Sequence, residues 1–386
     1  MLPSATRPPH GAARARAARF VAAALGVALA AAPAPAAAPP RNELGYRLAV
    51  PPWRFEFPRD HAAHPEFQTE WWYYTGHLRA GGRWFGFELT FFRVGLDPAR
   101  RASRSAWAPH TLHFAHAALT DERGRRFRFD ERAARPALGM AGADSARLRA
   151  WIGDWSAELL PDGRTHRLRA PARDFALALD LAPLKPPAAH GADGVSQKSA
   201  GEGRASHYYS LTRLAARGTV TVDGVEHAVE GTAWMDHEFG SSQLAPDLVG
   251  WDWFAVQLED GRELMLYRLR REDGSDEPHS SGTLVARDGR ATHLPREAFS
   301  IEATGAWTSP HSGATYPSGW RLRVPRAGLD LALEPTLADQ ELRTGGPAGV
   351  TYWEGAVRVT GAAAGAPARG RGYVELTGYA GRAPGF

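Results

Sequence analysis

Short runs of aromatic and β-branched residues recur along the chain, separated by glycine, proline or Asp-Gly turn signals. Runs of about four to eight such residues between turn signals are typical of β-strands. Long stretches with the period of an amphipathic helix are scarce. The pattern therefore predicts a mostly β protein, with strands that include residues 71–78, 84–92, 112–119, 175–181, 208–215, 251–258 and 263–269.

Glycine-containing turns join several neighbouring runs of this kind. Five of them lie between apolar stretches: Gly81-Gly82, Asp162-Gly163, Asp223-Gly224, Asp260-Gly261 and Asp288-Gly289. Such residue pairs supply the positive φ angles that a tight hairpin requires. We therefore expect antiparallel hairpins, closed into barrels or folded into sandwiches that hide the sheet edges.

The chain also carries one short internal repeat. An aromatic-led strand, a glycine turn and a return strand occur at residues 72–87 and again at residues 253–266. The repeat predicts two related β-domains, at residues 39–240 and 241–386. Residues 183–205 are rich in Pro, Gly and Ala, and we interpret them as a lid or a flexible loop.

Residues 1–38 have the pattern of a secretory signal peptide. Four arginines precede an apolar run at residues 20–32, and small residues follow it. The run is shorter than the ~20 residues that a membrane-spanning helix needs. Because the chain has no cysteine, it offers neither disulfides nor a lipid-modified cysteine. We expect a secreted or periplasmic protein whose mature chain has no transmembrane segment.

Removal of this leader changes the charge of the protein. The whole chain has a net charge of +4, and the leader holds four arginines and no acidic residue, so the mature chain is electrically balanced. Nucleic-acid binding needs a clustered basic surface, and we therefore expect no nucleic-acid partner. The nucleophile elbow of serine hydrolases, the zinc-protease helix motif and the glycine loops of nucleotide sites are also missing. We expect no cofactor.

Ionisable and large aromatic side chains are most concentrated at residues 231–240. In an extended strand, Trp234, Asp236 and Glu238 share one face, and His237 points to the other. If the first face borders an apolar cavity, burial favours the acid form of Asp236, which becomes a proton donor near neutral pH. The alternative is an ordinary solvated strand face. Because consecutive strand residues cannot easily share one ion, we expect no metal here.

Residues 61–74 form a second candidate region for ligand contact, because histidines, carboxylates and aromatic residues are crowded there. Glu70 and Trp72 are its candidate ligand-binding residues. The alternative is an initial segment whose aromatic side chains plug a barrel.

Five sequence blocks resemble the AttH-like family, which includes the carotenoid 1,2-hydratases. The blocks are residues 64–78, 234–240, 250–254, 352–355 and 372–379, and they span about residues 50–380. The resemblance implies two lipocalin-like antiparallel β-barrels in tandem. This fold agrees with the repeat and with the hairpin turns.

The resemblance also implies a reaction, the addition of water across a terminal isoprenoid double bond. The hydratases use an acidic Asp in a Tyr-x-Asp strand motif, helped by an upstream His-x-Trp. This chain has Trp234-x-Asp236 and His207-x-Tyr209, so the acid and the histidine are kept while the aromatic partners are exchanged. The exchange leaves carotenoid specificity open. By this resemblance, Asp236 is the catalytic acid, and His207 orients Asp236 or the attacking water.

An acid of this kind needs aromatic neighbours that stabilise the carbocation formed when an alkene is protonated. We expect a cavity lined by His207, Tyr209 and Trp234, with Trp251 or Trp253 beside them. An elongated apolar ligand would enter between the barrels or through a barrel mouth.

Two function classes therefore fit the sequence. The first is a hydro-lyase similar to the carotenoid 1,2-hydratases. The second is a non-enzymatic periplasmic carrier of a lipid-like ligand, or an accessory protein of an ABC transporter, in which Asp236 and His207 only hydrogen-bond a head group. An interaction scaffold is a third class, but it needs no buried aspartate.

Overall fold

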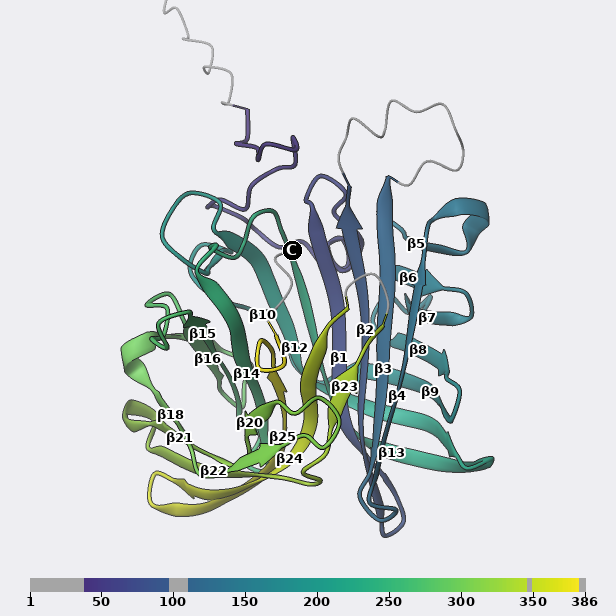
Figure 1. Cartoon of the computed structure of the whole chain (residues 1–386), viewed down its shortest axis with the longest axis vertical. Helices are drawn as coiled ribbons and strands as arrows, with labels where there is room; N and C mark the ends of the chain where they lie inside the picture. The colour runs from purple at the N-terminus through teal and green to yellow at the C-terminus, as the bar shows by residue number, and fades with distance from the viewer. Residues whose placement is uncertain (1–37, 97–109, 346–348, 382–386) are drawn as a thin grey trace, which may run out of the picture. The chain divides into compact units, whose positions relative to one another are not determined.

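Two antiparallel β-sheets contain most strands of the computed structural model, which describes residues 38–96, 110–345 and 349–381 (Figure 1). The first sheet has 13 strands. They are β1 (Thr69–Ala80), β2 (Arg83–Gly95), β3 (Thr111–Asp121), β4 (Arg126–Ala134), β5 (Ala141–Ala143), β6 (Arg149–Ile152), β7 (Trp155–Leu159), β8 (His166–Pro171), β9 (Phe175–Pro183), β10 (Ala188–Ala189), β11 (Ser196–Gln197), β12 (Ala205–Val222) and β13 (Val225–Gly240).

The second sheet has ten strands, and a two-stranded sheet of β19 and β20 accompanies it. These strands are β14 (Leu248–Leu258), β15 (Glu263–Arg271), β16 (Ser281–Val285), β17 (Ala291–Pro295), β18 (Ser300–Ala303), β19 (Ala306–Thr308), β20 (Thr315–Pro317), β21 (Trp320–Val324), β22 (Leu329–Pro335), β23 (Glu341–Arg343), β24 (Thr351–Ala363) and β25 (Ala366–Leu376). The described residues contain no α-helix, only the short 3₁₀ turns η1 (Arg59–His61), η3 (Ala137–Gly139), η4 (Arg296–Ala298) and η5 (Pro325–Ala327). The predicted mostly β class is confirmed.

The two sheets use their first strands in the same way. The order β4-β3-β2-β1-β13 in the first sheet corresponds to β17-β16-β15-β14-β25 in the second, so each opening strand pairs with the next strand and with the last one. The repeated sequences form the equivalent hairpins β1–β2 and β14–β15. All five predicted turns connect paired antiparallel strands. At Asp223-Gly224 both φ angles are positive, 51° and 76°, as a two-residue hairpin loop requires.

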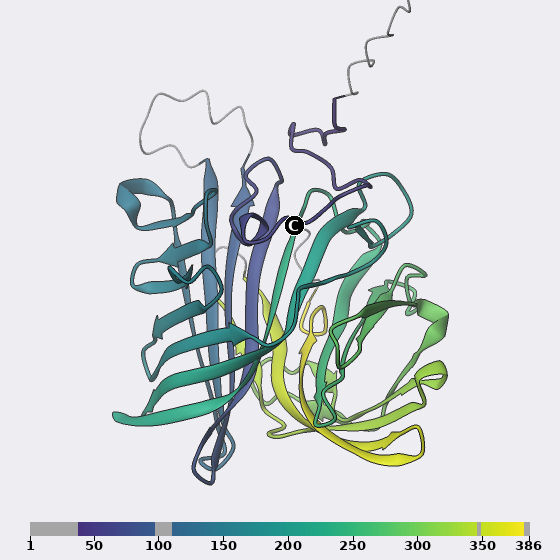
Figure 2. The ribbon, with the colours of Figure 1, turned by 180° about the vertical axis from the view of Figure 1, so that it is seen from behind.

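Apolar side chains form a separate core within each sheet and a third cluster between the sheets. The first sheet curls so that β6 contacts β3 and β4, and its inner face holds the largest cluster. The strands β1 and β2 lie beside β25 and β24 in both views (Figures 1 and 2). The cluster between the sheets consists mainly of aromatic residues, among them Tyr73, Tyr208, Trp234, Trp253 and Tyr373.

The central strands β1, β12 and β13 have different side chains on their two faces. On β13, Ala233 and Met235 point into the first core, while Trp234 joins the cluster between the sheets. The predicted alternation along this strand is therefore confirmed. A bulge in β12 between Leu211 and Leu214 shifts its register against β13.

Residues 183–205 are not the flexible loop that their composition suggested. The strands β10 and β11 of this segment both pair with β12. His190 and Lys198 are buried, with 1% and 6% of their surfaces exposed. The segment is therefore fixed onto the first sheet and delivers two ionisable side chains to the interior.

Two expectations about the chain's organisation are not decided by this fold. The predicted leader falls on residues 1–37, which lie outside the described residues, and on Ala38. Residues Pro39–Phe386 form one compact unit, and the division into domains 39–240 and 241–386 stays a prediction. Among the described residues, no helix is both long and apolar enough to cross a membrane.

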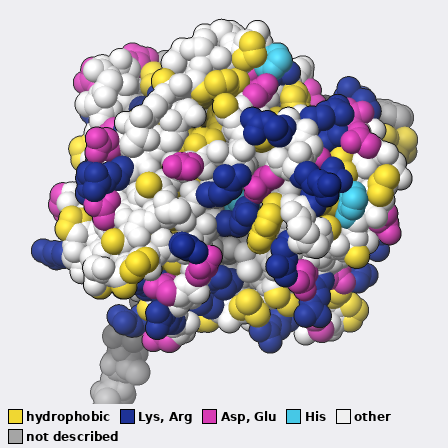
Figure 3. Space-filling view, turned by 90° about the horizontal axis from the view of Figure 1, so that it is seen from below, with side chains coloured by type: hydrophobic (Ala, Val, Ile, Leu, Met, Phe, Trp, Pro, Cys, Tyr) yellow, Lys and Arg dark blue, Asp and Glu magenta, His cyan; other side chains and the backbone are white. Residues whose placement is uncertain are grey.

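Basic and acidic side chains lie interspersed on the face shown in Figure 3.

Candidate active site

A cavity of about 100 Å³ lies between the two sheets, next to Asp236. Its walls are mostly aromatic, and its ionisable groups include three carboxyl groups and one lysine. The lining residues are Trp71, Tyr73, Thr90, Phe92, Lys198, Tyr208, Asp236, Glu238, Gln243, Leu244, Trp251, Trp253, Tyr267, Leu269 and Glu375. Strand alternation places these side chains together, because β1, β12, β13, β14 and β25 each turn one face toward this space.

Asp236 is held by three hydrogen-bond donors. Tyr208 Oη donates to Oδ2 at 2.5 Å, Trp234 Nε1 donates to Oδ1 at 2.6 Å, and the Ser210 hydroxyl also donates to Oδ1. Burial raises the pKa of Asp236 to about 7; the three donors oppose this rise, and the nearby Glu238 adds to it. The carboxyl group therefore carries a proton for part of its time at neutral pH, as a general acid must.

Two further carboxyl groups face the same cavity in different electrostatic surroundings. Glu238 is paired with Lys198 Nζ at 3.0 Å, and Lys198 also lies 4.4 Å from the ring centre of Tyr267. Glu375 has no such lysine partner, and burial raises its pKa to about 7, with Asp236 and Glu238 adding to the effect. The cavity thus combines one ion pair with two carboxyl groups that can hold or release a proton near neutral pH.

The structure brings Asp236, Trp234, Trp251 and Trp253 together, as the sequence predicted. It does not bring His207 to them. The imidazole of His207 stacks on Trp53 with 4.3 Å between ring centres, and its Nδ1 lies 3.0 Å from the Gly194 carbonyl. The expectation that His207 orients Asp236 is therefore wrong for this fold.

Tyr209, Glu70 and Trp72 also lie on the opposite face from Asp236. Register explains the error, because Ser210 of β12 is paired with Asp236, and its neighbour Tyr209 with His237. Side chains one residue apart point to opposite faces. The residues on the side of Asp236 are therefore the sequence neighbours of the predicted ones. On β12, Tyr208 and Ser210 hydrogen-bond to Asp236, and on β1, Trp71 and Tyr73 line the cavity.

The histidine that reaches Asp236, through one intervening serine, is His190. Its Nε2 lies 2.6 Å from Ser210 Oγ, and its Nδ1 lies 2.8 Å from Thr283 Oγ1. Sequence reasoning missed it because it belongs to the segment interpreted as a loop. The only sequence signal is the position of this histidine in the segment that precedes β12.

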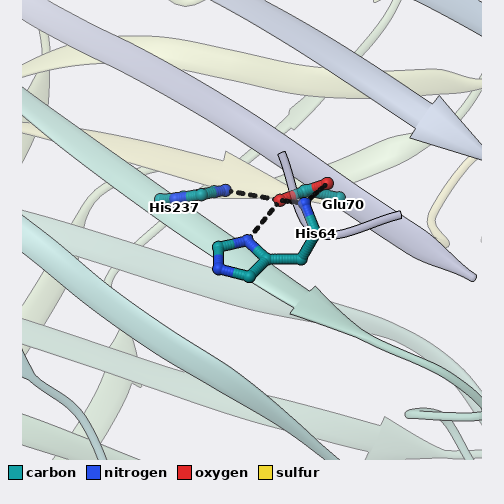
Figure 4. Close-up of side chains that lie close together, drawn as sticks. All are labelled: His64, Glu70 and His237. Atoms are coloured by element: carbon teal, nitrogen blue, oxygen red, sulfur yellow. Dashed lines mark hydrogen bonds and ion pairs between the residues drawn. The ribbon is translucent and has the colours of Figure 1, made fainter. Parts of the chain in front are cut away.

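Glu70 is the centre of a buried ion network on the opposite face (Figure 4). His64 Nδ1 and His237 Nε2 each lie 2.9 Å from the same Glu70 oxygen, and Arg93 Nε lies 3.0 Å from the other. These two histidines and Glu70 are the one group in the described residues whose ligand atoms are close enough to hold a metal ion. The positively charged Arg93 forms an ion pair with Glu70. Interactions with Asp60 and Glu70 raise the pKa of His64 against the effect of its burial. The network is therefore neutralised by the chain's own cations.

Comparison with known proteins decides the family. A family model described as AttH-like matches residues 48–379. The chain belongs to the AttH-like family. Its fold is similar to that of a protein assigned as AttH from Nitrosomonas europaea, with 36% sequence identity, a TM-score of 0.77, and coverage of 86% of this chain and 98% of that chain.

A second solved structure shares the AttH-like fold at much lower identity. Kievitone hydratase from Nectria haematococca has 14% identity and a TM-score of 0.67, over 84% of this chain and 92% of that chain. No curated protein matches the chain. The predicted resemblance to the AttH-like family is thus confirmed, and the distant neighbour shows a shared fold only.

Substitution of Tyr208 by phenylalanine is expected to raise the pKa of Asp236. The Tyr208 hydroxyl stabilises the charged carboxylate, and its loss leaves only two donors. Tyr209→Phe is the matched control, because Tyr209 lies on the other face of β12. The carboxyl resonance of Asp236 in a ¹³C NMR titration measures both pKa values. An equal rise in the two variants would contradict the placement of Tyr208.

Glu375→Gln is expected to make the stability of the folded protein less dependent on pH. The folded state holds a proton on Glu375 up to about pH 7, while the unfolded chain releases it near its ordinary value of 4.5. Wild-type stability therefore falls between these values as pH rises. Between pH 5 and pH 8, we expect the free energy of unfolding of the variant to rise by up to about 3 kcal/mol relative to that of wild type. Urea unfolding at both pH values measures the difference, and a pH-independent difference would refute it.

Proposed function

We propose that this protein is a hydro-lyase that adds water to a carbon–carbon double bond at the end of an elongated, isoprenoid-like ligand, with Asp236 as the general acid. One observation carries the proposal: a buried aspartate whose pKa is raised to about 7 faces a cavity with aromatic walls. Membership of the AttH-like family supports it, because the resemblance to the hydratases includes the position of the acid.

The chemistry follows from the groups around the cavity. Asp236 gives its proton to one alkene carbon, and a tertiary carbocation forms at the other. Trp251, Trp253 and Tyr208 line the cavity, and aromatic rings of this kind stabilise such a charge. Water then attacks the cation, and the resulting oxonium loses its extra proton to Glu375. The product contains one added water, and the protein returns to its starting state when Asp236 regains a proton and Glu375 releases the one that it took.

The size of the cavity limits what can enter it. A protein cavity of roughly 150 Å³ can hold benzene, and this one measures about 100 Å³. We infer that only the branched end of a ligand, on the order of five carbon atoms, lies beside Asp236. The rest of an elongated ligand would extend out of the cavity toward solvent.

Incubation of the protein with acyclic carotenoids and shorter isoprenoids in ¹⁸O-labelled water tests the proposal. We expect products that carry one labelled hydroxyl group by mass spectrometry. Mass spectrometry of a lipid extract from the purified protein identifies any ligand that co-purifies. A bound ligand that is recovered unchanged under all conditions would refute catalysis and favour the carrier, including one that serves an ABC transporter.

We also propose that the protein is exported to the periplasm or beyond. The support is the arginine-rich and apolar pattern of residues 1–38. We expect N-terminal sequencing of the protein from its native cells to begin near residue 39, without a lipid. A mature protein that begins at Met1 would refute export by this route.

A further inference from the structure

The imidazole of His190 lies in the middle of a hydrogen-bonded chain that ends on Asp236. Thr283 Oγ1, 2.8 Å from Nδ1, and Ser210 Oγ, 2.6 Å from Nε2, are its two partners. The Ser210 hydroxyl donates to Asp236 Oδ1, so Ser210 Oγ accepts the His190 Nε2 proton. His190 Nδ1 then accepts the hydroxyl proton of Thr283. Each bond therefore has a direction, from Thr283 toward Asp236.

This series of hydrogen bonds crosses from one sheet to the other inside the protein. Ser210 and Asp236 belong to the first sheet, and Thr283 belongs to β16 of the second. The exposed surface is 0% for Ser210 and 1% for both His190 and Thr283. Thr283 is paired with His293 on β17. Paired residues project from the same face, and His293 is exposed, so the far end of the chain lies beside a titratable group that reaches solvent.

The charges around His190 keep it in its neutral form. Burial lowers its pKa well below the ordinary value, and Lys198 and His293 lower it further. A neutral imidazole can accept a proton at one nitrogen while it releases another. The other end of the chain, Asp236, shares its cavity with Glu238 and Glu375, and both disfavour a second negative charge there.

We propose that Thr283, His190 and Ser210 form a proton relay that returns a proton to Asp236 from solvent at His293. The relay rests on the proposed function, since an acid that protonates carbon must be recharged after each turnover. Ser210 passes its hydroxyl proton to Asp236 Oδ1 and takes one from His190 Nε2. His190 takes its replacement at Nδ1 from Thr283, whose own proton is replaced from solvent by way of His293. One proton enters by this path for each proton that leaves through Glu375.

The relay can be tested without a substrate. Time-resolved infrared spectroscopy after a downward pH jump follows the carboxylic acid band of Asp236, which is assigned by its loss in Asp236→Asn. His190→Gln keeps both hydrogen bonds, because the amide donates to Ser210 and accepts from Thr283, but it cannot pass a proton. We expect the pKa of Asp236 to stay the same and its rate of protonation to fall by at least about tenfold.

Three further variants separate a relay from a structural contact. Thr283→Val removes the hydroxyl group that donates to His190 and is expected to slow protonation of Asp236 equally. This variant keeps the relay testable if His190→Gln does not fold. His190→Ala should recover its rate when imidazole is added to the buffer. His279→Gln changes a partly exposed histidine bonded to Glu277 and should leave the rate unchanged.

Equal protonation rates in wild type, His190→Gln and Thr283→Val would overturn the relay. A rate in His190→Ala that does not respond to imidazole would also overturn it. Because no ligand is present, these results are independent of whether the protein hydrates an isoprenoid. Hydration with unchanged protonation rates would refute the relay alone, and slowed protonation without hydration would refute the proposed function alone.

Discussion

Asp236→Asn is expected to abolish hydration while the protein still folds and binds its ligand. The amide has the shape of the carboxyl group, and its nitrogen can face the oxygen of Tyr208, but it cannot protonate carbon. Loss of a general acid typically lowers the rate by about 10²–10⁴-fold. The ligand affinity should change by no more than the ~1–3 kcal/mol of a lost polar contact. Product formation in ¹⁸O-labelled water and ligand titration measure the two effects separately.

Asp174→Asn is the matched control for this substitution, because Asp174 lies exposed between β8 and β9. It should retain the wild-type rate. Label incorporation that persists undiminished in Asp236→Asn would show that the acid is another residue. If wild type forms no labelled product and Asp236→Asn changes affinity alone, the protein is a carrier.

Glu70→Ala is expected to lower the free energy of unfolding by about 3–5 kcal/mol, the effect of leaving buried charges without a partner. Arg93, 3% exposed, and His64, fully buried, would both lose the carboxylate that faces them. Urea unfolding at neutral pH measures the loss. A decrease below about 1 kcal/mol would mean that the network does not hold this part of the first sheet.

The chain offers a matched control for this prediction at the protein surface. Arg79 and Glu230 are also 3.0 Å apart, but their side chains are 51% and 63% exposed. Glu230→Ala should therefore cost only about 0–1 kcal/mol. The comparison isolates burial, because the distance between the charged groups is the same in both pairs.

The local pattern of the sequence predicted the strands and the face of β13 that carries Asp236. Both depend on period-two alternation, which a sequence displays directly. The partners of Asp236 depend instead on the register between strands far apart in the chain. Residues 207 and 209 have the same spacing as 208 and 210, and only the pairing of Ser210 with Asp236 decides which pair faces the acid. Carrying the family's histidine motif onto His207 could not reveal this register.

His190 and Lys198 escaped prediction for a different reason. Their segment has the composition of a loop, and its strands β10 and β11 are only two residues long. Such short strands leave no periodic pattern. They form because β12 offers unpaired backbone groups at this point, which is a property of the folded sheet rather than of the segment itself.

Two neighbouring residues of β13, Asp236 and His237, have different surroundings and different partners. Asp236 faces the aromatic cavity, and His237 contacts Glu70 on the other side. A shift of one residue turns every following side chain to the opposite face. Deletion or insertion of one residue between Gly231 and Trp234 would therefore exchange the acid and the histidine without altering either. In a mutational scan, this segment should therefore tolerate no change in its length.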